Sequence, residues 1–313
     1  MIVVICGLLG TAAILLIGTE KMQKIPFTIS LNNSFKQSKW PKNTLVVIPA
    51  IWKEIDWSNR TNWPSWLREG LGWSNTNPRS YYIHLYQRMD PNSTIPYDWP
   101  YCPNVHEETG IYLQFIRDHY HDLPDKMLFI HGNPFIHTSY NPIQSALCVR
   151  DNVHFASVND VREWIQKRPW TYWPQDPDDK VALMYKCAKR ILTLLGYEAE
   201  LILNPTSKTP KDENLISGFC CAQFYVTKQR IHHYTYEQWL SLYDANFEPF
   251  CTTPRENEQL GKGIQWFGGT LEHTWHVILG LYPVDAPAPL IKTEIDRCQW
   301  FRPSCKGSPC TRE

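Results

Sequence analysis

The chain has 313 residues, of which 43% are hydrophobic and 20% charged, a composition that excludes an intrinsically disordered protein. Lys and Arg together number 31, as do Asp and Glu, so the formal net charge is zero and gives no electrostatic basis for binding nucleic acid. The length suits one large domain with appendages.

The N-terminal segment determines the expected compartment. Residues 2–18 carry no charge and are nearly all aliphatic. Such a run is marginal in length for a bilayer span, long for the apolar part of a signal peptide, and lacks a preceding basic stretch. We therefore expect a retained signal anchor at 1–18, followed by a polar stem at 19–43, in a single-pass membrane protein.

The orientation of the chain has two opposing indications. Lys21 and Lys24 follow the apolar run, and the positive-inside rule would place the downstream chain in the cytoplasm. Three glycosylation sequons, which begin at Asn32, Asn59 and Asn92, favour the opposite side. The cysteines agree with the sequons, so we expect a luminal (ER or Golgi) or extracellular domain and a glycoprotein.

Cysteines are concentrated near the C-terminus. One of the ten lies in the apolar segment and nine follow it, three of them in a Pro- and Cys-rich tail at 283–313. This pattern predicts disulfides in an oxidising compartment. An odd number leaves one thiol over, which we expect at Cys220 or Cys221. Zinc binding is the competing interpretation of the tail. It is less favoured than disulfides, because the spacing C-x6-C-x4-C lacks the C-x2-C pair of common zinc sites.

Residues 44–282 are expected to form an α/β domain. Residues 44–49 are a continuous β-branched run of the kind that is buried on both faces of a sheet. Because strands and helices alternate, we expect a mainly parallel, Rossmann-related sheet flanked by helices. Strands are predicted at 44–49, 80–86, 126–130 and 218–226, and helices at 63–70, 107–121, 158–166, 178–195, 234–243 and 271–279.

The first candidate site follows the strand at 126–130. It reads His131-Gly132-Asn133-Pro134, with a second imidazole at His137. In open α/β sheets, ligands bind beyond the carboxyl ends of strands, and a glycine lets the backbone approach a ligand closely. The two imidazoles could bind a metal or donate to phosphate oxygens. A tight turn with histidines that only stabilise the fold is the alternative, and the position does not separate the two.

Further candidates are carboxylates and an amide. Glu272 and His276 would share one face of a helix, as a base and its orienting partner or as metal ligands, or simply as a polar face. Glu107 and Glu108 could hold a cation or act as a base, or could only complement the helix dipole. Gln223 lies in an apolar strand and needs a partner, either a substrate or neighbouring backbone.

Several segments resemble an uncharacterised family, domain of unknown function 3431. The resemblance covers roughly residues 44 to 280, and it implies a domain without a known reaction. The matching pieces are Val46-Val-Ile48, His106-Glu-Glu-Thr-Gly-Ile-Tyr-Leu113, Leu123-Pro-Asp-Lys-Met-Leu-Phe-Ile-His131, Cys221-Ala-Gln-Phe-Tyr-Val-Thr-Lys-Gln-Arg-Ile231 and Glu272 to Gly280.

The order of these elements, with the anchor and stem, is also similar to GT-A glycosyltransferases. That similarity implies a nucleotide-sugar donor, a carbohydrate or glycoprotein acceptor, and a divalent cation such as Mn²⁺ or Mg²⁺. The loop at His131 lacks the Asp-x-Asp motif of these enzymes, which puts the metal in doubt.

The implied roles divide the candidate residues into three groups. Two other functions are alternatives to the glycosyltransferase. One is a metal-dependent hydrolase, in which His276 would join the two loop histidines around the metal, and the other is a non-catalytic luminal binding or structural module. In the transferase, Glu272 or Glu108 would be the base or a metal ligand, and His131, Gly132, Asn133 and His137 would contact phosphates or a cation. Gln223 would contact the acceptor, and His276 would be a further ligand-binding residue.

Overall fold

The computed structural model describes the chain from residue 38 onward, with gaps. The expected anchor, most of the stem, the sequons at Asn32 and Asn92, and both Cys220 and Cys221 lie outside the described residues. Among the helices that are described, none is long and apolar enough to cross a membrane. The described ranges are 38–73, 79–88, 99–159, 165–169, 179–203, 215–219, 222–248, 251–253, 264–279 and 297–310.

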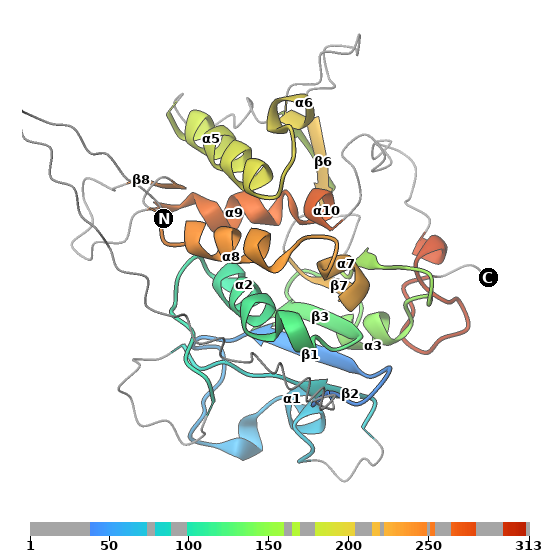
Figure 1. Ribbon diagram of the computed structural model, residues 1–313. Coiled ribbons are helices and arrows are strands. Elements are labelled where there is room, and N and C mark those ends of the chain that lie inside the picture. Colours follow the sequence, from blue (N-terminus) through green and yellow to red (C-terminus); the bar gives the residue numbers. More distant parts are fainter. Residues whose placement is uncertain are drawn as a thin grey trace, which may run out of the picture. The chain divides into compact units, whose positions relative to one another are not determined.

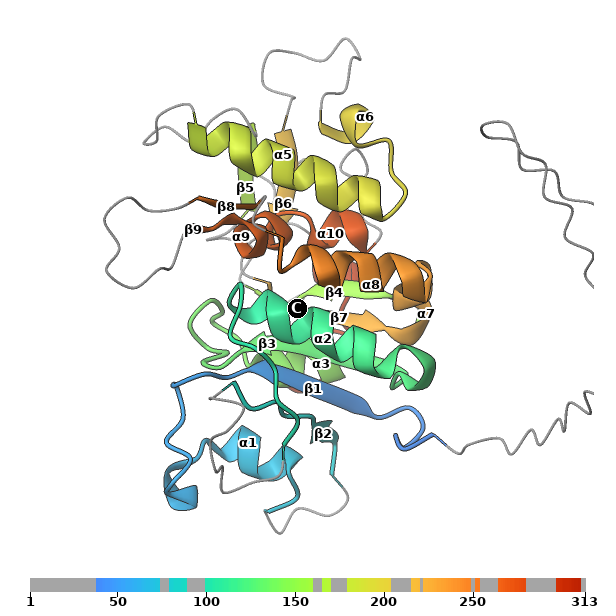
Figure 2. The ribbon, with the colours of Figure 1, turned by 60° about the vertical axis from the view of Figure 1, so that its left-hand side comes forward.

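The described part of the chain is built around a five-stranded sheet (Figures 1 and 2). The strand β1 pairs in parallel with both β2 and β3, whereas β7 is antiparallel to both β3 and β4. In the order β2-β1-β3-β7-β4, the strands are β2 (Tyr81–Ile83), β1 (Leu45–Ala50), β3 (Lys126–His131), β7 (Phe224–Thr227) and β4 (Phe155–Ser157).

The expectation of a mainly parallel sheet is therefore corrected to a mixed sheet. Two of its four strand pairings are antiparallel, because β7 enters after a long excursion and not through the crossover helix that parallel neighbours require. Only β7 is reversed, so the carboxyl ends of β1, β3 and β4 and the amino end of β7 meet at one edge. We call this the carboxyl edge.

Strand β1 shows how the sequence forms the core. All six of its residues are buried, as expected for a β-branched run covered on both faces. Because side chains alternate along a strand, Val46 and Ile48 pack into one apolar cluster, and Leu45 and Val47 pack into another on the opposite face.

Helices cover both faces of the sheet. The Val46 face carries α2 (Glu108–His119), α8 (Tyr236–Ala245), α9 (Trp266–Glu272) and α10 (Trp275–Ile278), and α5 (Asp179–Leu194) packs outside them (Figure 2). The opposite face carries α1 (Ser65–Gly70) and α3 (Pro142–Leu147). Smaller elements are α6 (Ala199–Leu203), α7 (Lys228–Ile231), the antiparallel pairs β5 (Ile165–Pro169) with β6 (Leu215–Phe219) and β8 (Thr252–Thr253) with β9 (Ile264–Gln265), and the 3₁₀ turns η1 (Arg60–Asn62), η2 (Tyr120–Asp122) and η4 (Arg297–Gln299).

Three predicted elements differ from the structure. The helix predicted at 158–166 is wrong where it is described, because Ile165 begins β5. The strand predicted at 218–226 is two strands, since β6 ends at Phe219 and β7 begins at Phe224. The helix predicted at 271–279 lies across the end of α9 and the separate short helix α10.

Three disulfides are present among the described residues. Two of them join segments 157 and 64 residues apart, and the third closes a loop of 12 residues within the tail, where the cysteine cluster predicted disulfides. The only free cysteine among the described residues is Cys102, and burial raises the pKa of its thiol to about 12, so it is unreactive at neutral pH. The disulfides are Cys148–Cys305, Cys187–Cys251 and Cys298–Cys310.

Candidate functional site

The loop after β3 is fixed to the sheet by the side chain of Gln223, which is only 1% exposed. Its Oε1 accepts from the backbone N–H of His131 at 3.3 Å. Its Nε2 donates to the carbonyl of Pro134 at 3.2 Å and to Oδ1 of Asn159 at 2.9 Å. The partners that the buried amide required are thus neighbouring backbone and a second buried amide. Arg297 extends the network by donating to the carbonyl of Asn159.

The loop brings its two histidines together. The ring centroids of His131 and His137 are 5.0 Å apart, and both side chains are partly exposed, while Asn133 is exposed. In the part of the chain that the structure describes, no three His, Cys, Asp or Glu side chains gather to hold a metal ion. Among the described residues, the predicted metal site therefore contains two imidazoles and no third ligand.

Gly132 is buried beside Glu54, a residue of the loop that follows β1. A Cβ at position 132 would lie 2.8 Å from the Glu54 carboxyl carbon and 3.0 Å from the carbonyl oxygen of Ala50. The glycine is needed here because two loops approach one another at the carboxyl edge.

The N-terminus of α2 places a buried carboxyl group near the same edge. Glu108 is 7% exposed, and burial raises its pKa to about 7. The Glu107 carboxylate adds to the shift, and a hydrogen bond from its own backbone and the Arg88 guanidinium oppose it. At neutral pH the carboxyl group is therefore divided between its protonated and ionised forms.

The turn before α2 is tight. His106 and Glu107 have φ of 47° and 54°, values that side-chain-bearing residues rarely adopt. Gly110 permits the turn, because a Cβ there would lie 2.5 Å from the carbonyl oxygen of Val105. Arg88 donates from Nη2 to that same oxygen at 3.3 Å and is 6% exposed. The turn thus holds a buried cation beside the buried acid.

Tyr112 connects the two carboxyl groups that were singled out in the sequence. Burial raises its pKa well above the usual value, and the charges of Glu108 and Glu272 raise it further. Its ring contacts Phe224 and Trp275, at centroid distances of 5.8 and 6.4 Å. The Tyr112 hydroxyl and the Trp275 indole N–H are buried without a hydrogen-bond partner among the described residues, an arrangement that is rare away from water or ligand sites.

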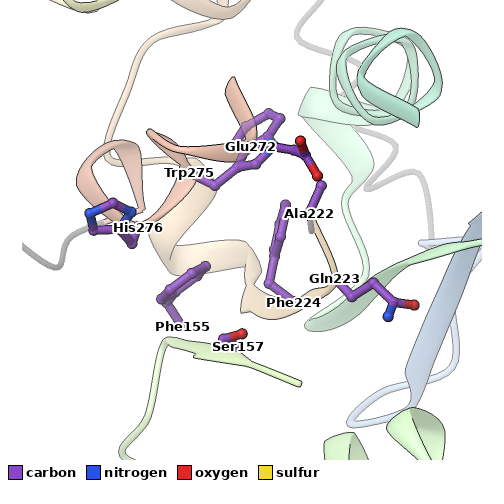
Figure 3. A pocket seen from close by; sticks show the side chains of 8 residues that line it. All are labelled: Phe155, Ser157, Ala222, Gln223, Phe224, Glu272, Trp275 and His276. Carbon is purple, nitrogen blue, oxygen red and sulfur yellow. The ribbon is translucent and has the colours of Figure 1, made fainter. Parts of the chain in front are cut away.

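A small pocket lies next to this group (Figure 3). Its volume of about 10 Å³ is room for one water molecule. The Glu272 carboxylate points toward Ala222, while the His276 ring lies on the other side of Trp275 (Figure 3). The two do not share the helix face that was predicted, because the chain turns between α9 and α10. The pocket is lined by Phe155, Ser157, Ala222, Gln223, Phe224, Glu272, Trp275 and His276.

The sequence did not single out four residues that now stand at this edge. Arg88 could have been noticed as a charged residue two positions after the strand predicted at 80–86. Glu54, Tyr112 and Asn159 carry no local signal of a site, because their places at this edge depend on contacts with distant segments, such as Gly132 for Glu54 and Gln223 for Asn159.

Asn59 is the only predicted glycosylation position among the described residues. It is exposed, and its Oδ1 accepts from the backbone N–H of Thr61 at 3.1 Å and from its hydroxyl at 2.6 Å. The side-chain nitrogen, to which a glycan would be attached, takes no part in these hydrogen bonds. Glycosylation of Asn59 stays a prediction.

Comparison with known families agrees with the resemblance in the sequence. The family described as "Protein of unknown function (DUF3431)" matches residues 60–291, and the chain belongs to it. No curated protein and no solved structure matches the chain. The matched range includes Arg88, Glu108 and Glu272.

Proposed function

We propose that the protein is a glycosyltransferase-like enzyme of the secretory pathway, with its site at the carboxyl edge. It would transfer a sugar from a nucleotide-sugar to a hydroxyl of a carbohydrate or glycoprotein acceptor. The observation that carries the proposal is the pair Glu108 and Glu272, two carboxyl groups from different helices near one buried Tyr112 phenol. Ligand sites in open α/β sheets lie at this edge.

The chemistry requires a base for the acceptor. The acceptor oxygen bonds to the anomeric carbon of the sugar, the bond from that carbon to the diphosphate breaks, and the hydroxyl proton passes to a carboxylate. Glu272 lines the pocket and can reach a ligand, so we assign it this role. Glu108, with its pKa of about 7, can take up or release a proton close by.

The leaving diphosphate requires donors. His131 and His137, with the exposed Asn133, lie on a loop that is rigidly held by Gln223 and can donate to phosphate oxygens. No step is assigned to a divalent cation, because no third His, Cys, Asp or Glu side chain joins His131 and His137 among the described residues.

The test is release of nucleoside diphosphate from UDP- and GDP-sugars by the full-length chain. Replacing a catalytic base lowers turnover by about 10²–10⁴-fold, so Glu272→Gln should lose turnover by that amount and keep its melting temperature. Glu198→Gln, at an exposed position, is the matched control and should behave as the wild type. Wild-type turnover in Glu272→Gln would contradict the assignment.

A hydrolase is the second candidate, favoured by a pocket beside Glu272 whose volume is room for one water molecule. It would release the same nucleoside diphosphate without an acceptor, with free sugar as the second product, and restoration of activity by added metal would implicate His131 and His137. A non-catalytic luminal module would show no turnover of any nucleotide-sugar in the wild type or in any variant.

A further inference from the structure

The carboxyl ends of β1 and β3 lie at a special position in the sheet. The chain leaves β1 toward β2 on one side and leaves β3 toward β4 on the other, so the strand order reverses between them (Figure 2). Ala50 is paired with His131 at the ends of these strands. Such a reversal point, at the carboxyl ends of the strands, is where ligands of open α/β sheets bind.

A carboxylate of the protein itself occupies this position. Oε2 of Glu54 accepts from the backbone N–H groups of Trp52 at 2.6 Å and Lys53 at 3.0 Å. A Cβ on Gly132 would lie 2.9 Å from that same oxygen, so the missing side chain makes room for it. Two amides that converge on one oxygen, beneath a glycine, form a surface that binds anions.

The surroundings favour negative charge. Lys53 adds an exposed ammonium group, which lies 4.2 Å from the centroid of the Trp52 ring. The Arg88 guanidinium is close enough to Glu54 for their charges to interact. Glu54 is itself exposed, so its carboxylate can turn out into solvent.

We propose that the surface formed by the Trp52 and Lys53 amides beneath Gly132 is a phosphate-binding site, and that the Glu54 carboxylate occupies it in place of the ligand and competes with it. The proposal rests on the proposed function in that the phosphate would be the diphosphate of the nucleotide-sugar. The bound ligand would take over the N–H groups of Trp52 and Lys53, and Glu54 would leave.

Pyrophosphate binding to the full-length chain, measured by titration calorimetry, tests the site. Glu54→Ala removes the competing carboxylate and should bind pyrophosphate about tenfold more tightly than the wild type, a ratio that corresponds to 1.4 kcal/mol. Glu54→Gln removes the charge but keeps an oxygen that can accept the same two hydrogen bonds, and should be intermediate. Glu198→Ala changes the net charge equally at a distant exposed position and should bind as the wild type does.

Three results would overturn the proposal. Glu54→Ala could bind pyrophosphate no better than the wild type, which would make Glu54 a local stabiliser of its loop. Glu198→Ala could improve binding equally, which would make the effect one of net charge. If Glu54→Ala does not fold, unchanged binding in Glu54→Gln is the contrary result. If Glu54→Ala binds pyrophosphate more tightly but the protein turns over no nucleotide-sugar, the phosphate-binding site is supported and the glycosyltransferase function is rejected.

Discussion

The raised pKa of Glu108 makes the stability of the protein depend on pH in a defined direction. In the unfolded chain a glutamate releases its proton near 4.5, whereas the folded protein holds this one up to about 7. Between these values the folded state binds more protons, so the free energy of unfolding falls as the pH rises. At about 1.4 kcal/mol per pH unit, the loss over this interval is about 3 kcal/mol.

Replacement of Glu108 by Gln should remove this dependence. A glutamine has nearly the shape of the protonated acid and does not ionise, so the variant should gain about 3 kcal/mol relative to the wild type between pH 4 and pH 8. Urea denaturation at several pH values, with the disulfides intact, measures the difference. Glu198→Gln, at an exposed site, should follow the wild type. Parallel curves for Glu108→Gln and the wild type would show that the carboxyl group is not desolvated as described.

Three further predictions concern the structure around the site. Gln223→Met should cost about 2–4 kcal/mol by urea denaturation and speed amide exchange at His131, because buried partners lose their hydrogen bonds; unchanged exchange would contradict this. Removal of the Cys148–Cys305 disulfide, which spans 157 residues, should cost about 5 kcal/mol on the chain-entropy model; a loss below about 1 kcal/mol would refute it. Gly132→Ala should lower the melting temperature and cost about 1–3 kcal/mol, since its Cβ meets a backbone oxygen at 3.0 Å; equal or higher stability would oppose the tight loop contact.

The fold was predictable where a single segment carries a clear pattern of apolar residues. Residues 44–49 and 126–130 are buried apolar runs, and the structure places β1 and β3 there. The direction of β7 was not predictable, because antiparallel and parallel strands that are buried on both faces have the same composition. The short strand β4 has only three residues and no local signal that separates it from a loop.

The same distinction between local signals and distant contacts applies to the candidate site. His131 and Gly132 could be found because they directly follow a recognisable strand, and Gln223 because a buried amide must be satisfied. The function of Gln223 in fixing the His131 loop could not be found, since its partners lie 64 to 92 residues away. The environment of Glu108 likewise depends on Arg88 and on packing that the sequence does not display.

The most direct test of a donor site at the carboxyl edge is thermal unfolding of the full-length chain with UDP- and GDP-sugars, with and without manganese. A ligand at 100 times its dissociation constant stabilises the folded protein by about 2.7 kcal/mol. We predict a higher melting temperature with at least one nucleotide-sugar, and an equal rise in Glu272→Gln, which retains the phosphate contacts. An unchanged melting temperature with every nucleotide-sugar would contradict the donor site and favour the binding module.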